Sequence, residues 1–152
     1  MANTYSQIYL HCVFATKPYS VSYIKENQKD TVEKYITGII TNNRCKLIAI
    51  YCNPDHTHIL FGMKPTTCIP QLIQSIKGSS SKFIHDHYKN IHFGWQDGYG
   101  IFSCSPSAID RVAKYILRQK EHHAKKRLKD EYRSMLTQAK INYDEKYIFD
   151  FE

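Results

Sequence analysis

Strand-like and helix-like patterns alternate along the first 104 residues, and their order narrows the choice of folds more than any other feature. Apolar and polar side chains that alternate with a period of two indicate strands, and apolar side chains at intervals of three and four indicate helices. The predicted strands cover residues 5–16, 47–52, 56–63 and part of 93–104. The predicted helices cover residues 24–43 and 70–89, the second weakened by a Gly-Ser-Ser-Ser run.

This βαββαβ order predicts an α+β fold. Short hairpin-linked strands with two crossing helices are typical of an antiparallel sheet of ferredoxin-like or RRM-like type, with the helices on one face. The other face of the sheet would then stay free for a site. Downstream of the sheet we expect a further helix over about residues 106–126, and a tail over about residues 127–152 that holds one more short helix near residues 128–139.

Length and composition are those of one ordinary globular domain. The chain has 152 residues, of which 42% are hydrophobic, and no apolar run approaches the roughly 20 residues of a membrane span. The first seven residues are polar and lack the basic-then-apolar pattern of a secretion signal. We therefore expect a single cytoplasmic domain over residues 1–152.

The five cysteines do not predict a disulfide framework. Their number is odd and no C-x-x-C pair occurs, so each is best interpreted as a small buried hydrophobe. A zinc site built from Cys45, Cys52, His56 and His58 is the alternative. Structural zinc sites usually separate their histidines by three to five residues, whereas one residue separates these two, so we consider the alternative weak.

The positive charge is concentrated in one stretch. The net charge is +7, and between Arg111 and Arg133 nine Lys or Arg residues stand against three acidic ones, which gives +6. A concentrated basic surface favours a polyanionic partner through counterion release, although a solvated helix face would have the same composition. Twelve tyrosines add candidates for stacking on unpaired bases.

His56 and His58 are the first candidates for a metal site. On a strand, residues two apart point to the same face, so both imidazoles can reach one ion, while Thr57 points to the core. The second H-x-H motif, His85 and His87, lies in a predicted helix, where residues two apart lie about 200° apart around the axis. The same spacing therefore predicts a site only at the first pair.

The helix predicted after Ser105-Pro106 carries the second set of candidates, because serine caps a helix and proline suits its first turn. At 100° per residue its apolar side chains fall in one stripe: Ile109, Val112, Ala113, Ile116 and Leu117.

Tyr115 and Gln119 lie four residues apart and so share a different face, together with His122 and flanked by arginines. Tyr115 therefore stands on a polar, cationic face and is not simply a core aromatic. His123 falls toward the apolar side, and we expect it to be structural. A phenol with a pKa near 10 is a poor nucleophile, but a metal-bound phosphate and nearby cations would stabilise the charge that develops during attack. We therefore expect Tyr115 and the first histidine pair to form one site.

The ordered set of these motifs resembles one family. The matching pieces are residues 11–17 (HCVFATK), 54–58 (PDHTH), 95–100 (WQDGYG), Phe102-Ser103, Tyr115-Ile116 with Gln119 and His122-His123, and residues 143–147 (YDEKY). Each piece is weak alone, but together they run through almost the whole chain. The sequence resembles the single-tyrosine HUH transposases, the small enzymes of bacterial and archaeal insertion sequences that move as single-stranded DNA.

The resemblance implies that His56, His58 and Gln119 bind a divalent metal, Mg²⁺ or Mn²⁺, and that Tyr115 is the nucleophile. Its attack would leave a 5′-phosphotyrosine and free a 3′-OH, and rejoining would reverse the step. Because the phosphotyrosine keeps the bond energy, no ATP is needed, in agreement with the lack of a P-loop motif in the sequence.

The resemblance also implies a partner and an assembly. The partner would be single-stranded DNA with hairpins near the element ends, and a homodimer would place the tyrosine helix of one subunit over the histidine pair of the other. We expect His122 and Arg118 to support the site. The candidates for DNA binding are Arg111, Lys114, Lys120, Lys125, Lys126 and Arg127.

One residue departs from the family pattern. The middle position of the histidine triplet is usually a bulky hydrophobe, and here it is Thr57. Because threonine is close in shape to valine, we expect a modest loss of stability rather than a loss of chemistry. Two alternatives stay open: a domesticated or inactive hairpin-binding relative without transposition, and a related nuclease of plasmid or phage replication. The presence of His56, His58, Tyr115 and Gln119 favours an active enzyme.

Overall fold

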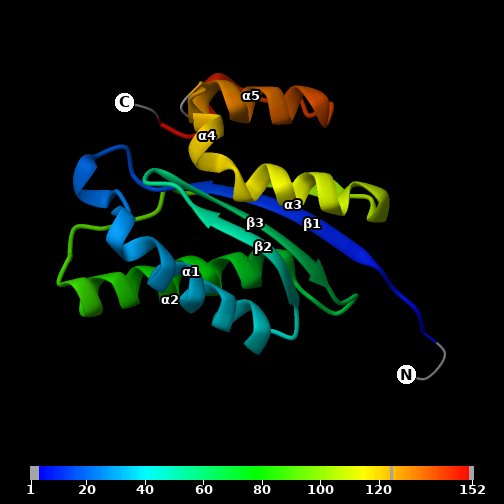
Figure 1. Ribbon diagram of the computed structural model, residues 1–152, viewed down its shortest axis with the longest axis horizontal. Helices are drawn as coiled ribbons and strands as arrows, with labels where there is room; N and C mark the ends of the chain where they lie inside the picture. Colours follow the sequence, from blue (N-terminus) through cyan, green and yellow to red (C-terminus); the bar gives the residue numbers. More distant parts are fainter. Residues whose placement is uncertain (1–3, 124, 151–152) are drawn as a thin grey trace.

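The centre of the fold is a four-stranded antiparallel sheet with strand order β2-β3-β1-β4 (Figure 1). The computed structural model describes residues 4–123 and 125–150. The strands are β1 (Ile8–Ala15), β2 (Lys46–Cys52), β3 (His56–Met63) and β4 (Gly100–Cys104). This order and the two crossing helices confirm the predicted α+β, ferredoxin-like arrangement.

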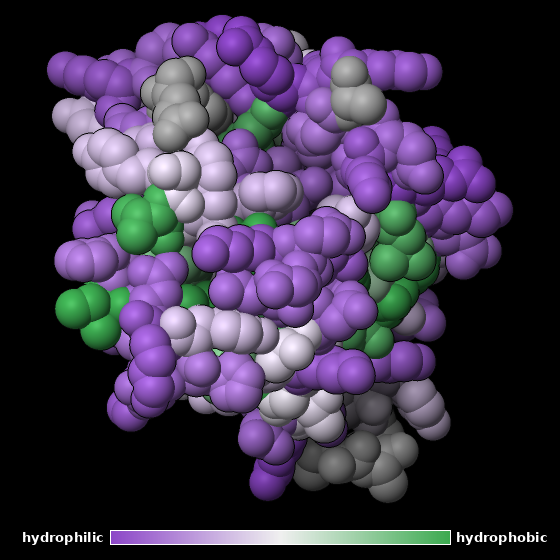
Figure 2. Space-filling model, turned by 60° about the vertical axis from the view of Figure 1, so that its left-hand side comes forward, coloured by the Kyte–Doolittle hydropathy of each residue, from purple (hydrophilic) through white to green (hydrophobic). Residues whose placement is uncertain are grey.

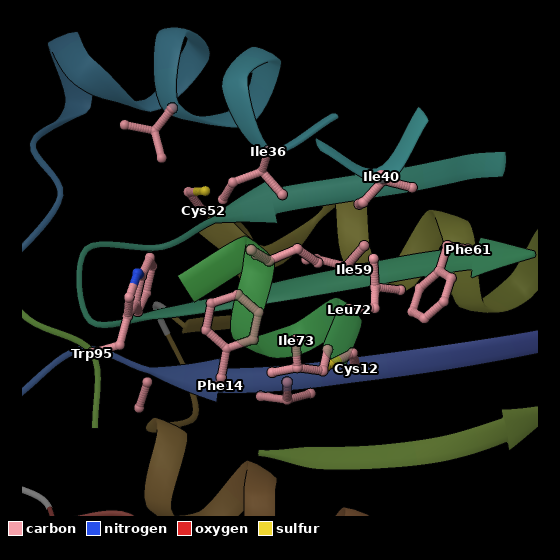
Figure 3. Packing of buried hydrophobic residues seen from close by; sticks show 14 of the residues in the cluster. Cys12, Phe14, Ile36, Ile40, Cys52, Ile59, Phe61, Leu72, Ile73 and Trp95 are labelled. Atoms are coloured by element: carbon pink, nitrogen blue, oxygen red, sulfur yellow. The ribbon is translucent and has the colours of Figure 1, made fainter. Parts of the chain in front are cut away.

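Helices α1 (Glu26–Asn42) and α2 (Ile69–Tyr88) cover one face of the sheet (Figure 1). The main core lies between them and the sheet, and Figure 3 shows Phe14, Ile59 and Phe61 pointing toward α1 and α2. Tyr35 of α1 stacks on Phe83 of α2, with ring centroids 4.2 Å apart. Burial of these apolar faces is the main driving force for the fold.

The expected weak point in α2 does not interrupt the helix. Ser80 is fully buried, and its hydroxyl accepts a hydrogen bond of 3.0 Å from the indole nitrogen of Trp95. The serine therefore serves as a polar anchor for Trp95, which packs edge-on against Phe14.

The last predicted strand is shorter than expected. Regular pairing begins only at Gly100, and the segment before it makes an isolated bridge between Thr16 and Trp95. Gly98 has a φ of +85°, a conformation that favours glycine, so the turn before β4 is specified locally. At Gly100 a Cβ atom would lie 2.7 Å from the ring of Tyr132, so the missing side chain lets the C-terminal part of the chain approach β4.

The second face of the sheet is not free, in contrast to the prediction. Helix α3 (Ile109–Leu117) lies across it, and Ile116 is buried against Ala49 and Leu60 (Figure 1). The other members of the predicted apolar stripe face the same way except Leu117, which is 58% exposed. The face that was expected to be open thus carries a second, smaller hydrophobic core, between the sheet and the tyrosine helix.

The predicted helix over residues 106–126 is also not continuous. A short 3-10 turn (Pro106–Ala108) precedes α3, the chain leaves helical geometry at Arg118, and α4 (Gln119–His123) follows. Residue 124 lies outside the described part of the chain. The predicted tail helix is confirmed as α5 (Leu128–Gln138). Further short 3-10 turns cover Ser20–Ser22 and Glu145–Tyr147.

The surface carries no extended apolar face in the view of Figure 2, where hydrophilic residues predominate and apolar ones form small patches. Among the residues that the structure describes, no helix is long and apolar enough to cross a membrane.

Candidate active site

His56 and His58 lie at the start of β3 with their rings on the α3 side of the sheet. Both are buried, and their ring centroids are 5.1 Å apart. Thr57 points to the opposite face, where its hydroxyl donates a long hydrogen bond to the thiol of Cys52. The turn before the strand is closed by a hydrogen bond of 2.8 Å from the amide of Asn53 to the carbonyl of His56. The predicted shared face of the two histidines is confirmed.

Each histidine is oriented through its second ring nitrogen. Nδ1 of His56 lies 2.7 Å from a carboxylate oxygen of Asp55, and Nδ1 of His58 lies 2.8 Å from Nε2 of His11. Such contacts fix the ring and leave Nε2 directed into the site. The two Nε2 atoms are therefore the ones presented to a ligand.

Tyr115 of α3 lies directly beside this pair. Its ring meets the ring of His58 edge-on at 5.9 Å between centroids and is half-buried. Its hydroxyl lies 3.4 Å from Nε2 of His122. The structure thus brings the predicted nucleophile and the predicted histidine ligands together within one chain.

Gln119 follows the helix break and is completely buried. Its side-chain nitrogen donates to the carbonyl of Tyr115 at 3.3 Å, so the break at Arg118 does not separate the two residues. Its side-chain oxygen accepts a hydrogen bond of 3.2 Å from Asn53 and lies 2.8 Å from Nε2 of His123. Gln119 therefore joins the tyrosine helix to the turn that precedes β3.

Two residues of the site were not predicted, His123 and Glu131. His123 was expected to be structural, which is wrong: its Nε2 lies 3.2 Å from Oε1 of Glu131, inside the cluster. His123 lies four residues after Gln119, and its Nε2 lies 2.8 Å from the side-chain oxygen of Gln119. The apolar side of the tyrosine helix faces the sheet on the side where the histidine pair lies, so a residue near the apolar stripe can reach the cluster.

Glu131 of α5 is buried at the centre of the cluster, 2% exposed. Its Oε1 lies 3.3 Å from Nε2 of His56 and 3.1 Å from Nε2 of His58. Its Oε2 lies 3.1 Å from Nε2 of His122 and accepts a hydrogen bond from the hydroxyl of Tyr115. A signal was present in the sequence, because Glu131 sits within the apolar stripe of its helix, where a charged residue is rarely placed without a partner.

Burial sets the charge state of two of the imidazoles. The pKa of His11 falls to about 3 because it is buried and faces His58. Burial also lowers the pKa of His58 to about 4, against the opposing attraction of Glu131. Burial acts on His56 in the same direction, but its hydrogen bonds to Asp55 and Glu131 outweigh burial and raise its pKa above the ordinary value.

The carboxylate and the phenol shift in opposite directions. Burial alone would raise the pKa of Glu131, but hydrogen bonds from His123, His56 and His58 outweigh it and hold that pKa well below its usual range. Burial and the negative charge of Glu131 raise the pKa of Tyr115. At neutral pH the site thus holds a carboxylate beside a protonated phenol.

The cluster offers a donor set for one divalent cation. One donor atom from each of His56, His58, His123 and Glu131 can be chosen so that all four lie within 4.8 Å of one another. Imidazole nitrogens and a carboxylate oxygen together suit a divalent ion such as Mn²⁺. The residues present therefore fit the metal that the sequence resemblance implies.

The other proposed metal arrangements are not formed by the described residues. The zinc alternative is wrong, because Cys45 and Cys52 stand apart from the cluster, beside Thr67 and Thr57 respectively. His85 bonds the carbonyl of Phe93, whereas His87 stacks on Phe83. The two residues of the second H-x-H motif thus have different partners, in agreement with the prediction that they do not bind one ion.

The predicted cations lie around the entrance to Tyr115. A hollow of about 780 Å³ is lined by Tyr115 and His122 together with the following charged side chains: Asp110, Arg111, Lys114, Arg118, Glu121 and Lys125. A second hollow of about 590 Å³ lies on the other side of Tyr115 and reaches Glu131, with Arg111 and Lys126 on its wall. The access to the tyrosine is therefore predominantly cationic.

The remaining DNA-binding candidates lie elsewhere. Lys120 is exposed on α4, and Arg127 lines a hollow of about 510 Å³ that reaches His123 from the side of Asp55. They do not share the entrance at Tyr115.

The histidine pair on an antiparallel sheet and the tyrosine helix over it agree with the family that the sequence resembles. Comparison with known families agrees: the chain belongs to the IS200-like transposases, whose family model matches residues 4–119. His123 and Glu131 lie beyond that matched segment.

Individual relatives support the same family. The chain is 24% identical over 116 residues to the ISDra2 transposase TnpA of Deinococcus radiodurans, which covers 72% of this chain and 82% of the relative. A crystal structure of a candidate transposase from Deinococcus radiodurans R1 is similar with a TM-score of 0.60 and 26% identity, over 77% of this chain and 94% of that one. The structure of a REP-associated tyrosine transposase bound to a REP hairpin shares the fold, with a TM-score of 0.61 and 13% identity over 80% and 72% of the two chains.

Proposed function

We propose that this protein is a cytoplasmic enzyme that cleaves and rejoins single-stranded DNA at the ends of an insertion sequence, through a covalent 5′-phosphotyrosine at Tyr115. One observation carries the proposal: the Tyr115 hydroxyl stands beside a buried histidine cluster, and Tyr115 lines two hollows whose walls carry arginine and lysine side chains. The family supports the class of reaction, and the position of the tyrosine supports its role as nucleophile.

His56, His58 and Gln119 are the proposed ligands of Mg²⁺ or Mn²⁺. When bound, the metal would polarise the scissile phosphate as a Lewis acid and so favour attack by a weak nucleophile. The neighbours of the two histidines support this role, because Asp55 and His11 direct the Nε2 atoms toward one point.

Tyr115 performs the covalent step. Its hydroxyl passes its proton to His122, whose Nε2 lies 3.4 Å away, and the oxygen attacks the scissile phosphorus to form the P–O bond of the 5′-phosphotyrosine. The bond to the 3′ oxygen breaks, and the electron pair leaves with that oxygen. The leaving oxygen takes up a proton and becomes a free 3′-OH. Rejoining is the reverse reaction with the 3′-OH of another DNA end, so the step needs no external energy source.

The side chains around Tyr115 position the DNA. His122 lies within hydrogen-bond reach of the Tyr115 hydroxyl, and Arg118 lines the same hollow. Arg111 and Lys114 on α3, and Lys125 beyond the end of α4, extend the cationic lining and suit the phosphates of a single strand. That a tyrosine transposase of the same fold holds a REP hairpin supports a hairpin as the structured part of the substrate.

The proposed assembly is a homodimer with exchanged tyrosine helices. Helix α3 is held to its own sheet by the small interior around Ile116, and a break at Arg118 follows directly. A short interface next to a break is compatible with exchange of α3 between two subunits. Size measurement by light scattering, with and without DNA, tests the dimer independently of the chemistry.

The experiment uses a hairpin-bearing single-stranded oligonucleotide from the ends of the protein's own element, with Mn²⁺. We expect a covalent protein–DNA product that disappears in Tyr115→Phe and persists in Tyr147→Phe, a control at an exposed tyrosine. A product that survives Tyr115→Phe would contradict the proposal. Hairpin binding without any covalent product, for every terminal sequence tried, would favour the inactive DNA-binding relative instead.

A further inference from the structure

The carboxylate of Glu131 is surrounded in an unusual way. Three imidazole nitrogens face a single oxygen, with Oε1 lying 3.3 Å from Nε2 of His56, 3.1 Å from Nε2 of His58 and 3.2 Å from Nε2 of His123. A carboxylate oxygen has two lone pairs, so it cannot accept three well-directed hydrogen bonds. Hydrogen bonding alone therefore explains the cluster poorly.

The same spacings are those of ligands around one ion. Two donors bound at about 2.1 Å to one metal lie about 3.0 Å apart in octahedral geometry and about 3.4 Å apart in tetrahedral geometry. The three measured distances, from 3.1 to 3.3 Å, fall between these values. All of these atoms are buried or nearly so, and a buried carboxylate among imidazoles is a common metal-binding combination.

The second oxygen of the same carboxylate faces the nucleophile. Oε2 accepts the hydrogen bond of the Tyr115 hydroxyl and lies 3.1 Å from Nε2 of His122. One side chain thus connects the histidine cluster on β3 to the reactive hydroxyl on α3. It does so from α5, which lies beyond the segment that matches the family model.

We propose that Glu131 is a ligand of the divalent metal through Oε1 and a positioning residue that holds the Tyr115 hydroxyl beside that metal through Oε2. This inference rests on the proposed metal site at His56 and His58. It adds a role for α5: metal binding fastens this helix to the sheet and to the tyrosine at the same time.

The first test measures Mn²⁺ binding by calorimetry or electron paramagnetic resonance, without DNA. We expect Glu131→Gln to bind Mn²⁺ roughly tenfold or more weakly, as loss of a ligand requires. Asp130→Asn, which removes the same charge from the exposed neighbouring position, should bind Mn²⁺ as the unmodified protein does. His56→Ala, with weakened binding expected, tests the metal site itself.

The outcomes separate the two proposals. Unchanged affinity in Glu131→Gln together with weakened binding in His56→Ala overturns the role of Glu131 and leaves the metal site standing. Unchanged affinity in both variants overturns the metal site and with it the present inference.

A second measurement uses the unmodified protein and so does not depend on how a variant folds. Addition of Mn²⁺ should slow hydrogen exchange at the amides of α5 and leave those of α1, on the opposite face of the sheet, unchanged. Metal binding with no added protection of α5 contradicts the proposal.

The positioning role is tested at saturating Mn²⁺. The amide of Glu131→Gln has one acceptor oxygen and cannot serve the metal and Tyr115 together. We therefore expect the cleavage rate constant to stay at least tenfold low when the metal site is filled, with the KM for the oligonucleotide unchanged. Full recovery of the rate at high Mn²⁺ overturns the positioning role.

Discussion

His56 differs from the histidines beside it in its affinity for a proton. Burial lowers the pKa of His11 and His58 to about 3 and about 4, so both are neutral over the whole physiological range. The pKa of His56 is instead raised above its ordinary value by Asp55 and Glu131. His56 is therefore the histidine at which protons and a metal compete near neutral pH.

This competition predicts how metal affinity depends on pH. A metal binds the neutral imidazole, so below the raised pKa of His56 its affinity should fall by about tenfold per pH unit. Asp55→Asn removes a group that raises this pKa and should move the decline to lower pH. Mn²⁺ titrations between about pH 5.5 and 8 measure both effects, and a Kd that stays constant over this range would contradict the assignment of His56.

At the scale of single elements, the attachment of α3 decides where Tyr115 lies. Ile116 is completely buried against Ala49 and Leu60, whereas Leu117 beside it is 58% exposed. Ile116 therefore contributes more than any other side chain of α3 to the packing of this helix on the sheet.

The pair gives a matched test. We expect Ile116→Ala to lower the free energy of unfolding by about 2–5 kcal/mol, because it leaves a cavity under the helix. The same change should reduce formation of the covalent DNA product, since Tyr115 is the preceding residue. Leu117→Ala should change stability by less than about 0.5 kcal/mol. Denaturant unfolding of both variants checks this, and equal effects would show that α3 is not anchored through Ile116.

The elements also show what sequence patterns could and could not predict. The shared face of His56 and His58 follows from the two-residue period of a strand. Over only three residues, a small departure from ideal strand geometry does not change which face a side chain is on. His123 was misplaced because it lies near the apolar stripe of its helix, and the sequence does not show that this stripe faces the same side of the sheet as the histidine pair. Glu131 was counted only as a surface charge, since its partners come from β3 and α3 and are distant in sequence.

The whole molecule has two unlike sides. Helices α1 and α2 cover one face of the sheet, and α3 covers the other (Figure 1). The hollows beside Tyr115 lie on the α3 side and are lined by the following cations: Arg111, Lys114, Arg118, Lys125 and Lys126. If this side binds a single strand, contacts with phosphates should release counterions and make the affinity depend on salt.

A lysine from each side tests this arrangement. Lys114→Ala, at the hollow beside Tyr115, should weaken oligonucleotide binding and lower the slope of log affinity against log salt by about 0.7, the value for one phosphate of a single strand. Lys34→Ala, an exposed lysine on α1, should leave both unchanged. Fluorescence anisotropy at several salt concentrations measures the slopes, and equal effects of the two substitutions would contradict a binding surface confined to the α3 side.

The most direct test of the account is to find the residue that carries the DNA. Trypsin cleaves after Lys114 and Arg118, so Tyr115 lies in the short peptide of residues 115–118. After reaction with an oligonucleotide and Mn²⁺, followed by nuclease and trypsin digestion, mass spectrometry should find the added nucleotide on this peptide. Attachment to the peptide of another tyrosine, such as the core residue Tyr132, would contradict the central claim.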